Sequence, residues 1–284
     1  MSHVAKCLAI REMLIKREKG HEVLVAVTKK HSQFLLEIDV DHNVLTDIQE
    51  IDGAASPTTT WFKEPQRIID CINAELALLK EYKPDRVLGI FRFTSKASAQ
   101  LAGIHYDSLI CGCMLPNSPE VLGFGKGDAG IDLQRENING FYQYAGAKLS
   151  LALTSLGLDR ISDIRQMLKG NRTFLWDFPE FLSIERKKNV IHVGPIFWND
   201  WAYNSVDNQE LPKSENPLAV ITFGTCTMSA AVVERIKNLL LDLGYDVLIA
   251  AGGQADLLGS MPREPRVIIS NFVLLHNCLL YTSP

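Results

Sequence analysis

The residues best suited to chemistry stand in the stretch 217–227, where a short apolar run gives way to Gly224 and Thr225. Residues 218–223 predict a buried strand, and apolar positions at helical spacing predict a helix over residues 228–243. A strand, a glycine turn and a helix N-terminus expose backbone N–H groups, and the helix dipole favours negative charge there. The stretch therefore indicates a phosphate site, with an ordinary strand-to-helix turn that binds nothing as the structural alternative.

A second glycine pair, Gly252 and Gly253, follows another apolar run. Residues 243–250 repeat the pattern of residues 19–26, in which a glycine, an aromatic ring and an acidic residue lead into a buried strand. Ligands in open α/β sheets bind beyond the carboxyl ends of the strands. The pair is thus a candidate binding element, and the repeated pattern fits two similar α/β domains or two unrelated units built in the same way.

Two other clusters of residues contain the residue types of a binding or metal site. A run of four glycines between residues 123 and 130 resembles a phosphate loop, but it lacks the G-K-[ST] ending and a clean preceding strand. We therefore interpret residues 116–138 as a mobile surface loop, whose functional version is a lid over a cleft. The six cysteines include one C-x-C pair, which we place inside an apolar strand, and no C-x-x-C pair. They predict buried thiols and no metal site.

The elements that must position these residues alternate between amphipathic helices and apolar strands. Helices are predicted over residues 4–19, 66–82, 96–102, 137–156 and 160–168, and strands over residues 23–27, 86–91, 106–111, 173–176 and 190–193. This alternation predicts open parallel sheets covered on both faces. A helix at the start of a βαβ unit requires a preceding strand, so we expect a first strand to be absent from this sequence.

The polar stretch 199–216 has the composition of a linker between domains. We therefore predict an N-terminal domain over residues 1–198 and a partial C-terminal domain over residues 217–284. The net charge is -4 with basic residues scattered among acidic ones, which argues against a nucleic-acid partner. The sequence contains no apolar run of about 18 residues and no signal-peptide pattern. We therefore expect no transmembrane segment, and we expect a cytoplasmic location.

Several short motifs, taken in order, resemble the glycosyltransferases of the UDP-glucuronosyltransferase and macrolide glycosyltransferase type. They lie at residues 8–10, 20–23, 83–85, 99–104, 194–196, 222–225 and 251–253. The resemblance spans nearly the whole chain, and its specificity comes from the order and spacing of the motifs. It implies the GT-B fold, with two Rossmann-like parallel-sheet domains of which the second is incomplete here.

The resemblance also implies an activity. Such enzymes transfer a sugar, with inversion and without a metal ion, from a nucleotide diphosphate sugar to a small-molecule hydroxyl acceptor. The N-terminal domain holds the acceptor and the C-terminal domain holds the donor, for which a UDP-sugar is our expectation. No cofactor beyond the nucleotide-sugar co-substrate is implied.

The resemblance places the general base at His3. A neutral imidazole can accept a proton near neutral pH, and a helix N-terminus lowers its pKa by disfavouring the cation. A surface histidine near a chain terminus is the structural alternative. Some members of the family orient this histidine with an aspartate, and the matching position here is about Ile90. An aliphatic side chain cannot orient an imidazole, so the sequence does not predict a histidine–aspartate dyad. Asp85, at the other end of that strand, is interpreted as a turn residue.

The donor site, by the same resemblance, includes Gly224 and Thr225 near the phosphates and Gly252 and Gly253 near the base. Phe272 and Val273 match the opening of the donor box, with a core phenylalanine as the alternative. The rest of that box would lie beyond residue 284, so we expect a fragment with little or no activity alone. Two other functions stay open: a nucleotide-sugar epimerase of the same fold, and a non-catalytic binding or activator partner.

Overall fold

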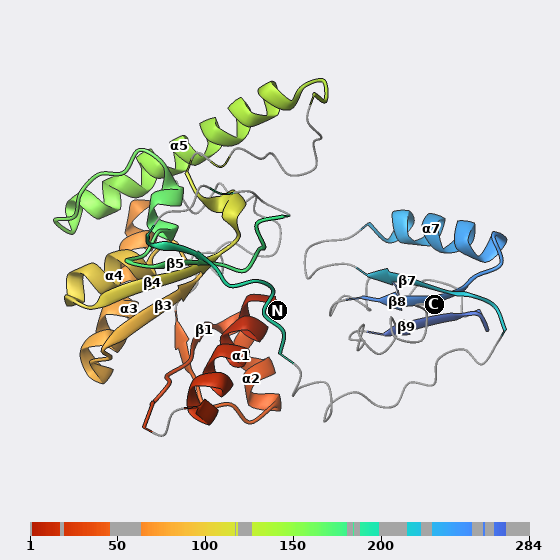
Figure 1. The fold of residues 1–284 in the computed structure, drawn as a ribbon, viewed down its shortest axis with the longest axis horizontal. Coiled ribbons are helices and arrows are strands. Elements are labelled where there is room, and N and C mark those ends of the chain that lie inside the picture. Colours follow the sequence, from red (N-terminus) through yellow and green to blue (C-terminus); the bar gives the residue numbers. More distant parts are fainter. Residues whose placement is uncertain are drawn as a thin grey trace. The chain divides into compact units, whose positions relative to one another are not determined.

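The computed structural model describes residues 2–17, 20–45, 64–116, 118, 127–180, 184, 188–198, 215–222, 229–251, 258 and 264–270. Contacts divide the chain into two compact units (Figure 1). One comprises Ser2–Trp198 and the other Asn199–Pro284 together with Met1. Of the predicted linker, residues 199–214 lie outside the described part. Among the described residues, no helix is both long and apolar enough to cross a lipid bilayer.

The main sheet of the first unit has four parallel strands in the order β3-β4-β5-β6. They are β3 (Arg86–Ile90), β4 (His105–Ile110), β5 (Thr173–Leu175) and β6 (Val190–His192). Parallel neighbours need crossover connections, and α4 (Ser95–Ala102) supplies the one between β3 and β4. The predicted α/β architecture with parallel sheets is confirmed, and each of these strands lies within a residue or two of its predicted range.

A smaller parallel sheet pairs β1 (Ala26–Thr28) with β2 (Asn43–Leu45), and α2 (Lys29–Glu37) connects them. The first strand was predicted over residues 23–27, which is wrong at both ends. Its partner β2 is only three residues long, so the ladder begins at the pair Ala26 and Asn43. The apolar pattern of residues 23–27 still predicts burial correctly at Val25, which is 1% exposed and packs beside α1 (Ser2–Arg17).

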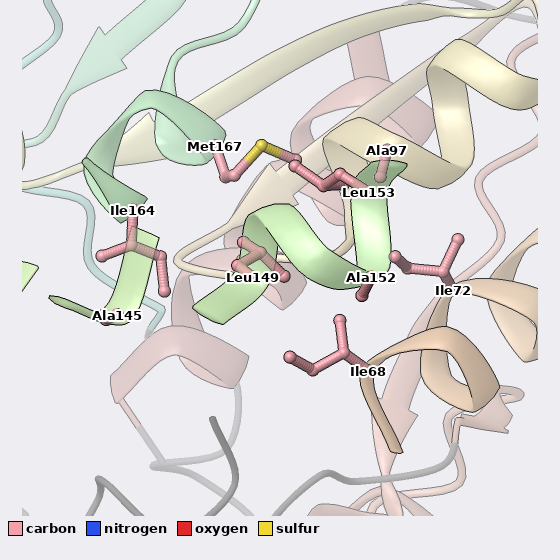
Figure 2. Packing of buried hydrophobic residues seen from close by; sticks show 9 residues of the cluster. All are labelled: Ile68, Ile72, Ala97, Ala145, Leu149, Ala152, Leu153, Ile164 and Met167. Atoms are coloured by element: carbon pink, nitrogen blue, oxygen red, sulfur yellow. The ribbon is translucent and has the colours of Figure 1, made fainter. Parts of the chain in front are cut away.

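Several helices pack against one another in the core of the first unit and form a layer (Figure 2). It consists of α3 (Pro65–Tyr82), α4, α5 (Ile131–Ser155) and the 3-10 helix η3 (Ile164–Leu168). Leu149 of α5, Ile72 of α3 and Ala97 of α4 have no exposed surface. A Cβ at Gly146 would stand 2.9 Å from the backbone of Asp163, so the close approach of α5 to the turn before η3 requires glycine.

Two predicted ranges in this region need correction. A helix was predicted over residues 160–168, but only η3 forms, because the Asp163 carboxylate accepts a hydrogen bond from the Arg165 N–H (2.8 Å) and starts the turn there. The loop predicted over residues 116–138 ends earlier, since α5 begins at Ile131. Gly130 precedes it with a φ of 87°, a conformation that favours glycine. Gly123 and Gly125 lie outside the described residues.

The second unit contains a parallel sheet in the order β7-β8-β9. The strands are β7 (Leu218–Thr222), β8 (Asp246–Ala250) and β9 (Val267–Ser270), and α7 (Ala230–Asp242) connects the first two. Val233 of α7 packs against Val247 and Ile249 of β8, all without exposed surface. This strand, helix, strand order is the one predicted from the apolar spacing.

Candidate functional site

The carboxyl end of the β3–β6 sheet gathers side chains that no single stretch of sequence brings together. Phe91 follows β3, Cys111 follows β4, Trp176 and Asp177 follow β5, and β6 ends at His192. Because the strands are parallel, these positions lie at one edge of the sheet. This is the edge at which open α/β sheets bind ligands.

His3, the predicted base, lies beside this edge as the second residue of α1. Its ring stacks on Phe91, with centroids 5.1 Å apart and an interplanar angle of 11°, and is tilted against Trp176 at 5.7 Å. The residue as a whole remains exposed to solvent. Within the described residues it makes these ring contacts and no hydrogen bond to a carboxylate.

The surroundings of His3 disfavour its protonated form. Desolvation by burial, followed by the positive charge of Lys6, lowers the pKa of His3 from 6.5 to about 4. The imidazole is therefore neutral at neutral pH, which leaves a ring nitrogen able to accept a proton. The predicted protonation state at this helix N-terminus thus has a physical basis in the packing around it.

Phe91 occupies the place where the family resemblance suggested a carboxylate near Ile90. Ile90 is the last residue of β3, and the backbone then turns through a φ of 52° at Phe91, which is unusual for a residue other than glycine. The turn presents an aromatic face to His3. An aromatic ring holds the imidazole by stacking and leaves any imidazolium charge without a carboxylate beside it.

A buried carboxylate anchors the segment that carries Phe91. Glu75 of α3 is 5% exposed and accepts hydrogen bonds from Arg92 Nε, Thr94 Oγ1 and Ser98 Oγ, each at 2.5 Å. Charge-assisted hydrogen bonds of this kind are stronger than neutral ones. They fix the backbone on the carboxyl side of Phe91, which explains how the strained turn persists.

Trp176, whose ring also contacts that of His3, and Asp177 follow β5. The Lys6 ammonium lies 4.7 Å from the centroid of the Trp176 ring. Desolvation lowers the pKa of Lys6, and the negative charge of Asp177 opposes that shift. Asp177 itself accepts hydrogen bonds from Cys111 Sγ (3.4 Å) and from the Gly112 N–H. Sequence reasoning missed both residues, although their position at the end of the strand predicted over residues 173–176 was a usable signal.

The cysteine pair was misplaced by the sequence prediction. Cys111 and Cys113 do not lie inside a strand, because β4 ends at Ile110 and the chain turns into the 3-10 helix η2 (Gly112–Met114). Both side chains are partly buried. Among the described residues, no group of three or more His, Cys, Asp or Glu side chains could hold a metal ion.

The predicted donor residues Gly224, Thr225, Gly252, Gly253, Phe272 and Val273 lie outside the described residues. The strands that precede them are described. Thr222 pairs with Ala250, and Ala250 pairs with Ser270, so β7, β8 and β9 end at the same edge of their sheet. Gly224, Gly252 and Phe272 each follow one of these paired ends by two positions in the sequence. The site itself stays a prediction.

No protein-family model matches the chain. A "PGL/p-HBAD biosynthesis rhamnosyltransferase" of Mycobacterium bovis (strain BCG / Pasteur 1173P2) is 24% identical over 277 residues, which cover 90% of this chain and 59% of that protein. The chain therefore spans less than two thirds of the length of this curated relative.

Solved structures agree over a greater share of their length. The calicheamicin glycosyltransferase CalG4 matches with a TM-score of 0.60 and 13% identity, covering 99% of this chain and 68% of its own. The glycosyltransferase SsfS6 of Streptomyces sp. SF2575, solved with thymidine diphosphate, matches with a TM-score of 0.55 and 18% identity, covering 97% and 68%. At these identities the likeness establishes architecture. The chain has a GT-B glycosyltransferase-like fold.

Proposed function

We propose that this chain is part of a glycosyltransferase that transfers a sugar from a nucleotide diphosphate sugar to a hydroxyl group of a small-molecule acceptor. The observation that carries the proposal is His3, which is neutral, exposed and seated at the carboxyl end of the β3–β6 sheet. The fold and the rhamnosyltransferase relative support the same reaction class.

In the proposed reaction, the acceptor binds at the edge formed by His3, Phe91 and Trp176. His3 accepts the proton of the acceptor hydroxyl while its oxygen attacks the anomeric carbon. The bond from that carbon to the diphosphate oxygen breaks, and the nucleotide diphosphate leaves with the electron pair. Attack from the face opposite the leaving group inverts the configuration. The products are the glycoside, the nucleotide diphosphate and a protonated His3, which returns its proton to water.

The donor nucleotide is proposed to bind beyond the paired ends of β7, β8 and β9, through Gly224, Thr225, Gly252, Gly253, Phe272 and Val273. Backbone N–H groups after such strand ends suit a diphosphate, so the proposal requires no metal ion. A UDP-sugar is the donor we propose first. The thymidine diphosphate bound to SsfS6 makes a dTDP-sugar the comparison to include.

The test compares variants of the whole protein that carries this chain. We expect His3→Ala to lower turnover with UDP- or dTDP-sugars by about 10²- to 10⁴-fold, because a general base typically contributes that much. Phenolic acceptors are the first choice, since a base of low pKa removes a proton most readily from an acidic hydroxyl. His105→Ala is the matched control, because His105 is exposed at the opposite end of the same sheet.

Each other function predicts a different outcome. Unchanged turnover in His3→Ala would show that His3 is not the base. Acceptor binding in a wild-type protein without turnover of either donor would favour the binding or activator partner. Conversion of the donor sugar to its epimer without an acceptor would favour an epimerase.

A further inference from the structure

Cys111 and Cys113 are brought together by the turn that follows β4. In a continuing strand, side chains two residues apart project on one face about 6.6 Å from each other. Here the Met114 N–H donates to the Cys111 carbonyl (3.0 Å), and the chain tightens into η2. As a result the Cys113 thiol donates to the Cys111 sulfur with the two Sγ atoms 3.1 Å apart. The two sulfurs are thus about 1 Å farther apart than in a disulfide bond.

The two sulfurs are chemically unequal. The hydrogen bond from Cys113 lowers the pKa of Cys111, and the same bond, followed by burial, raises the pKa of Cys113. Asp177 Oδ1 lies 3.4 Å from Cys111 Sγ and accepts its S–H, which opposes the lowering of the Cys111 pKa without reversing it. A thiolate is the reactive form of cysteine, so Cys111 is the attacking sulfur and Cys113 the resolving one.

The other described cysteines lack this chemistry. Burial raises the pKa of Cys7 to about 11, and Cys71 is 1% exposed within the core. Cys7 is therefore protonated at neutral pH, and Cys71 is shielded from solvent. They are internal standards of unreactive thiols within the same chain.

We propose that Cys111 and Cys113 form a redox-active dithiol that reacts with small-molecule disulfides. The Cys111 thiolate attacks one sulfur of a disulfide such as glutathione disulfide, forms a mixed disulfide and releases one thiolate. Cys113 then loses its proton and attacks Cys111 Sγ, which closes the protein disulfide and releases the second thiolate. The two protons of the dithiol end on the two released thiols. The dithiol is thus oxidised by two electrons and the small disulfide is reduced by two.

The test follows the sulfurs by mass spectrometry and does not depend on glycosyl transfer. Trypsin separates the described cysteines, because residues 97–126 hold Cys111 and Cys113 while residues 7–11 and 68–80 hold Cys7 and Cys71. After exposure of the native, reduced protein to glutathione disulfide, alkylation and digestion, we expect the peptide 97–126 to lose two hydrogens and to retain no glutathione. Peptides 7–11 and 68–80 should be alkylated as in the untreated protein.

Two conservative variants separate the roles. Cys113→Ser should trap glutathione on Cys111, and Cys111→Ser should leave Cys113 several-fold slower to react than Cys111 in the wild type. Cys71→Ser is the matched control and should close the disulfide normally. A wild-type peptide 97–126 that stays fully reduced, or that retains glutathione without closing, would overturn the proposal. Circular dichroism confirms that each variant is folded.

Discussion

At the amino end of the β3–β6 sheet, the Asp107 carboxylate accepts four hydrogen bonds, whereas at the carboxyl end His3 contacts two rings and makes no hydrogen bond within the described residues. The bonds to Asp107 come from Arg86 Nη1 (2.8 Å) and from Arg172 N, Nε and Nη2 (3.0, 3.1 and 2.6 Å). The Asp107 carboxylate and the two arginine side chains at this end therefore satisfy each other.

The carboxyl end is built in the opposite way. His192 Nε2 is buried without a hydrogen-bond partner among the described residues, and Phe91 has a strained φ. Unsatisfied polar atoms and backbone strain each cost on the order of 1–3 kcal/mol, and they concentrate at functional sites. The contrast indicates that the amino end of the sheet stabilises the fold. The carboxyl end holds reactive groups in an arrangement that lowers stability.

The largest expected effect on stability is at the amino end. Asp107→Asn should lower the free energy of unfolding by about 2–3 kcal/mol, because it removes a buried charge that is paired with two arginines. The loss stays moderate because the Arg86 and Arg172 side chains are 47% and 49% exposed and can bind water instead. Urea denaturation measures it. The site residues should be unaffected, so a large fall in glycosyl transfer by the folded variant would break the comparison.

The pH dependence of this effect has a defined sign. Desolvation raises the pKa of Asp107, but the hydrogen bonds from Arg172 and Arg86 outweigh it and hold the pKa below its ordinary value. The stability that Asp107 contributes is therefore complete above the unfolded-state pKa of about 3.9 and is lost as the pH falls through the lower folded-state pKa. The difference between wild type and Asp107→Asn should shrink below about pH 4 and stay constant above pH 5.

A smaller effect is expected at the carboxyl end, where two substitutions of Phe91 separate strain from packing. Both Phe91→Leu and Phe91→Gly remove the ring beside His3, so the pKa of His3 should rise from about 4 towards 6.5 in each. Glycine accepts a φ of 52° without strain, whereas leucine keeps a cost of about 1 kcal/mol. Phe91→Gly should therefore be at least as stable as Phe91→Leu, although it buries less apolar surface.

NMR titration of the His3 ring and urea denaturation measure the two quantities. A Phe91→Gly variant clearly less stable than Phe91→Leu would show that the lost apolar burial outweighs the strain of the turn. An unchanged His3 pKa in both variants would show that Phe91 does not desolvate the imidazole, and it would remove the main argument for Phe91 as a positioning residue.

The elements of the fold were predictable where local patterns decide them. The helix predicted over residues 66–82 is α3 (Pro65–Tyr82), because apolar spacing and the proline at its start are local signals. The strand at 23–27 was misplaced, since a strand ends where its partner ends and the sequence does not say which partner that is. The 3-10 turn at η3 depends similarly on one side chain, that of Asp163.

The candidate site was predictable only in part. The role of His3 as base came from a family resemblance, and its neutral state was predicted from its place at a helix N-terminus, whereas burial is the largest cause in the structure. The absence of an aspartate near Ile90 was visible in the sequence. The contacts of His3 with Phe91 and Trp176 were not, because they join three segments that are distant in the chain and meet only at a sheet edge. The donor residues stay a prediction, although the register of β7, β8 and β9 brings the preceding strand ends together.

The smallest effect we predict distinguishes the two ends of the sheet by pH. The folded-state pKa of His3 lies below its unfolded-state value of 6.5. Between these two pKa values the imidazole is protonated in the unfolded chain and neutral in the folded chain. Stability from His3 is thus complete above pH 6.5 and falls as the pH drops towards 4. The exposure of His3 keeps the effect small. Its window lies above that of Asp107, so each end of the sheet should lose stability in its own pH range.

The measurement is a difference between variants, which isolates the contribution of His3. The urea midpoints of wild type and His3→Gln are compared at pH 7.5, 5.5 and 4.5, and His105→Gln is the matched control. We expect the wild type to lose more stability than His3→Gln between pH 7.5 and 4.5, because glutamine cannot bind the proton, while His105→Gln follows the wild type. Parallel curves for wild type and His3→Gln would mean that His3 has an ordinary pKa. The packing of Phe91 and Trp176 would then have no effect on the protonation of His3.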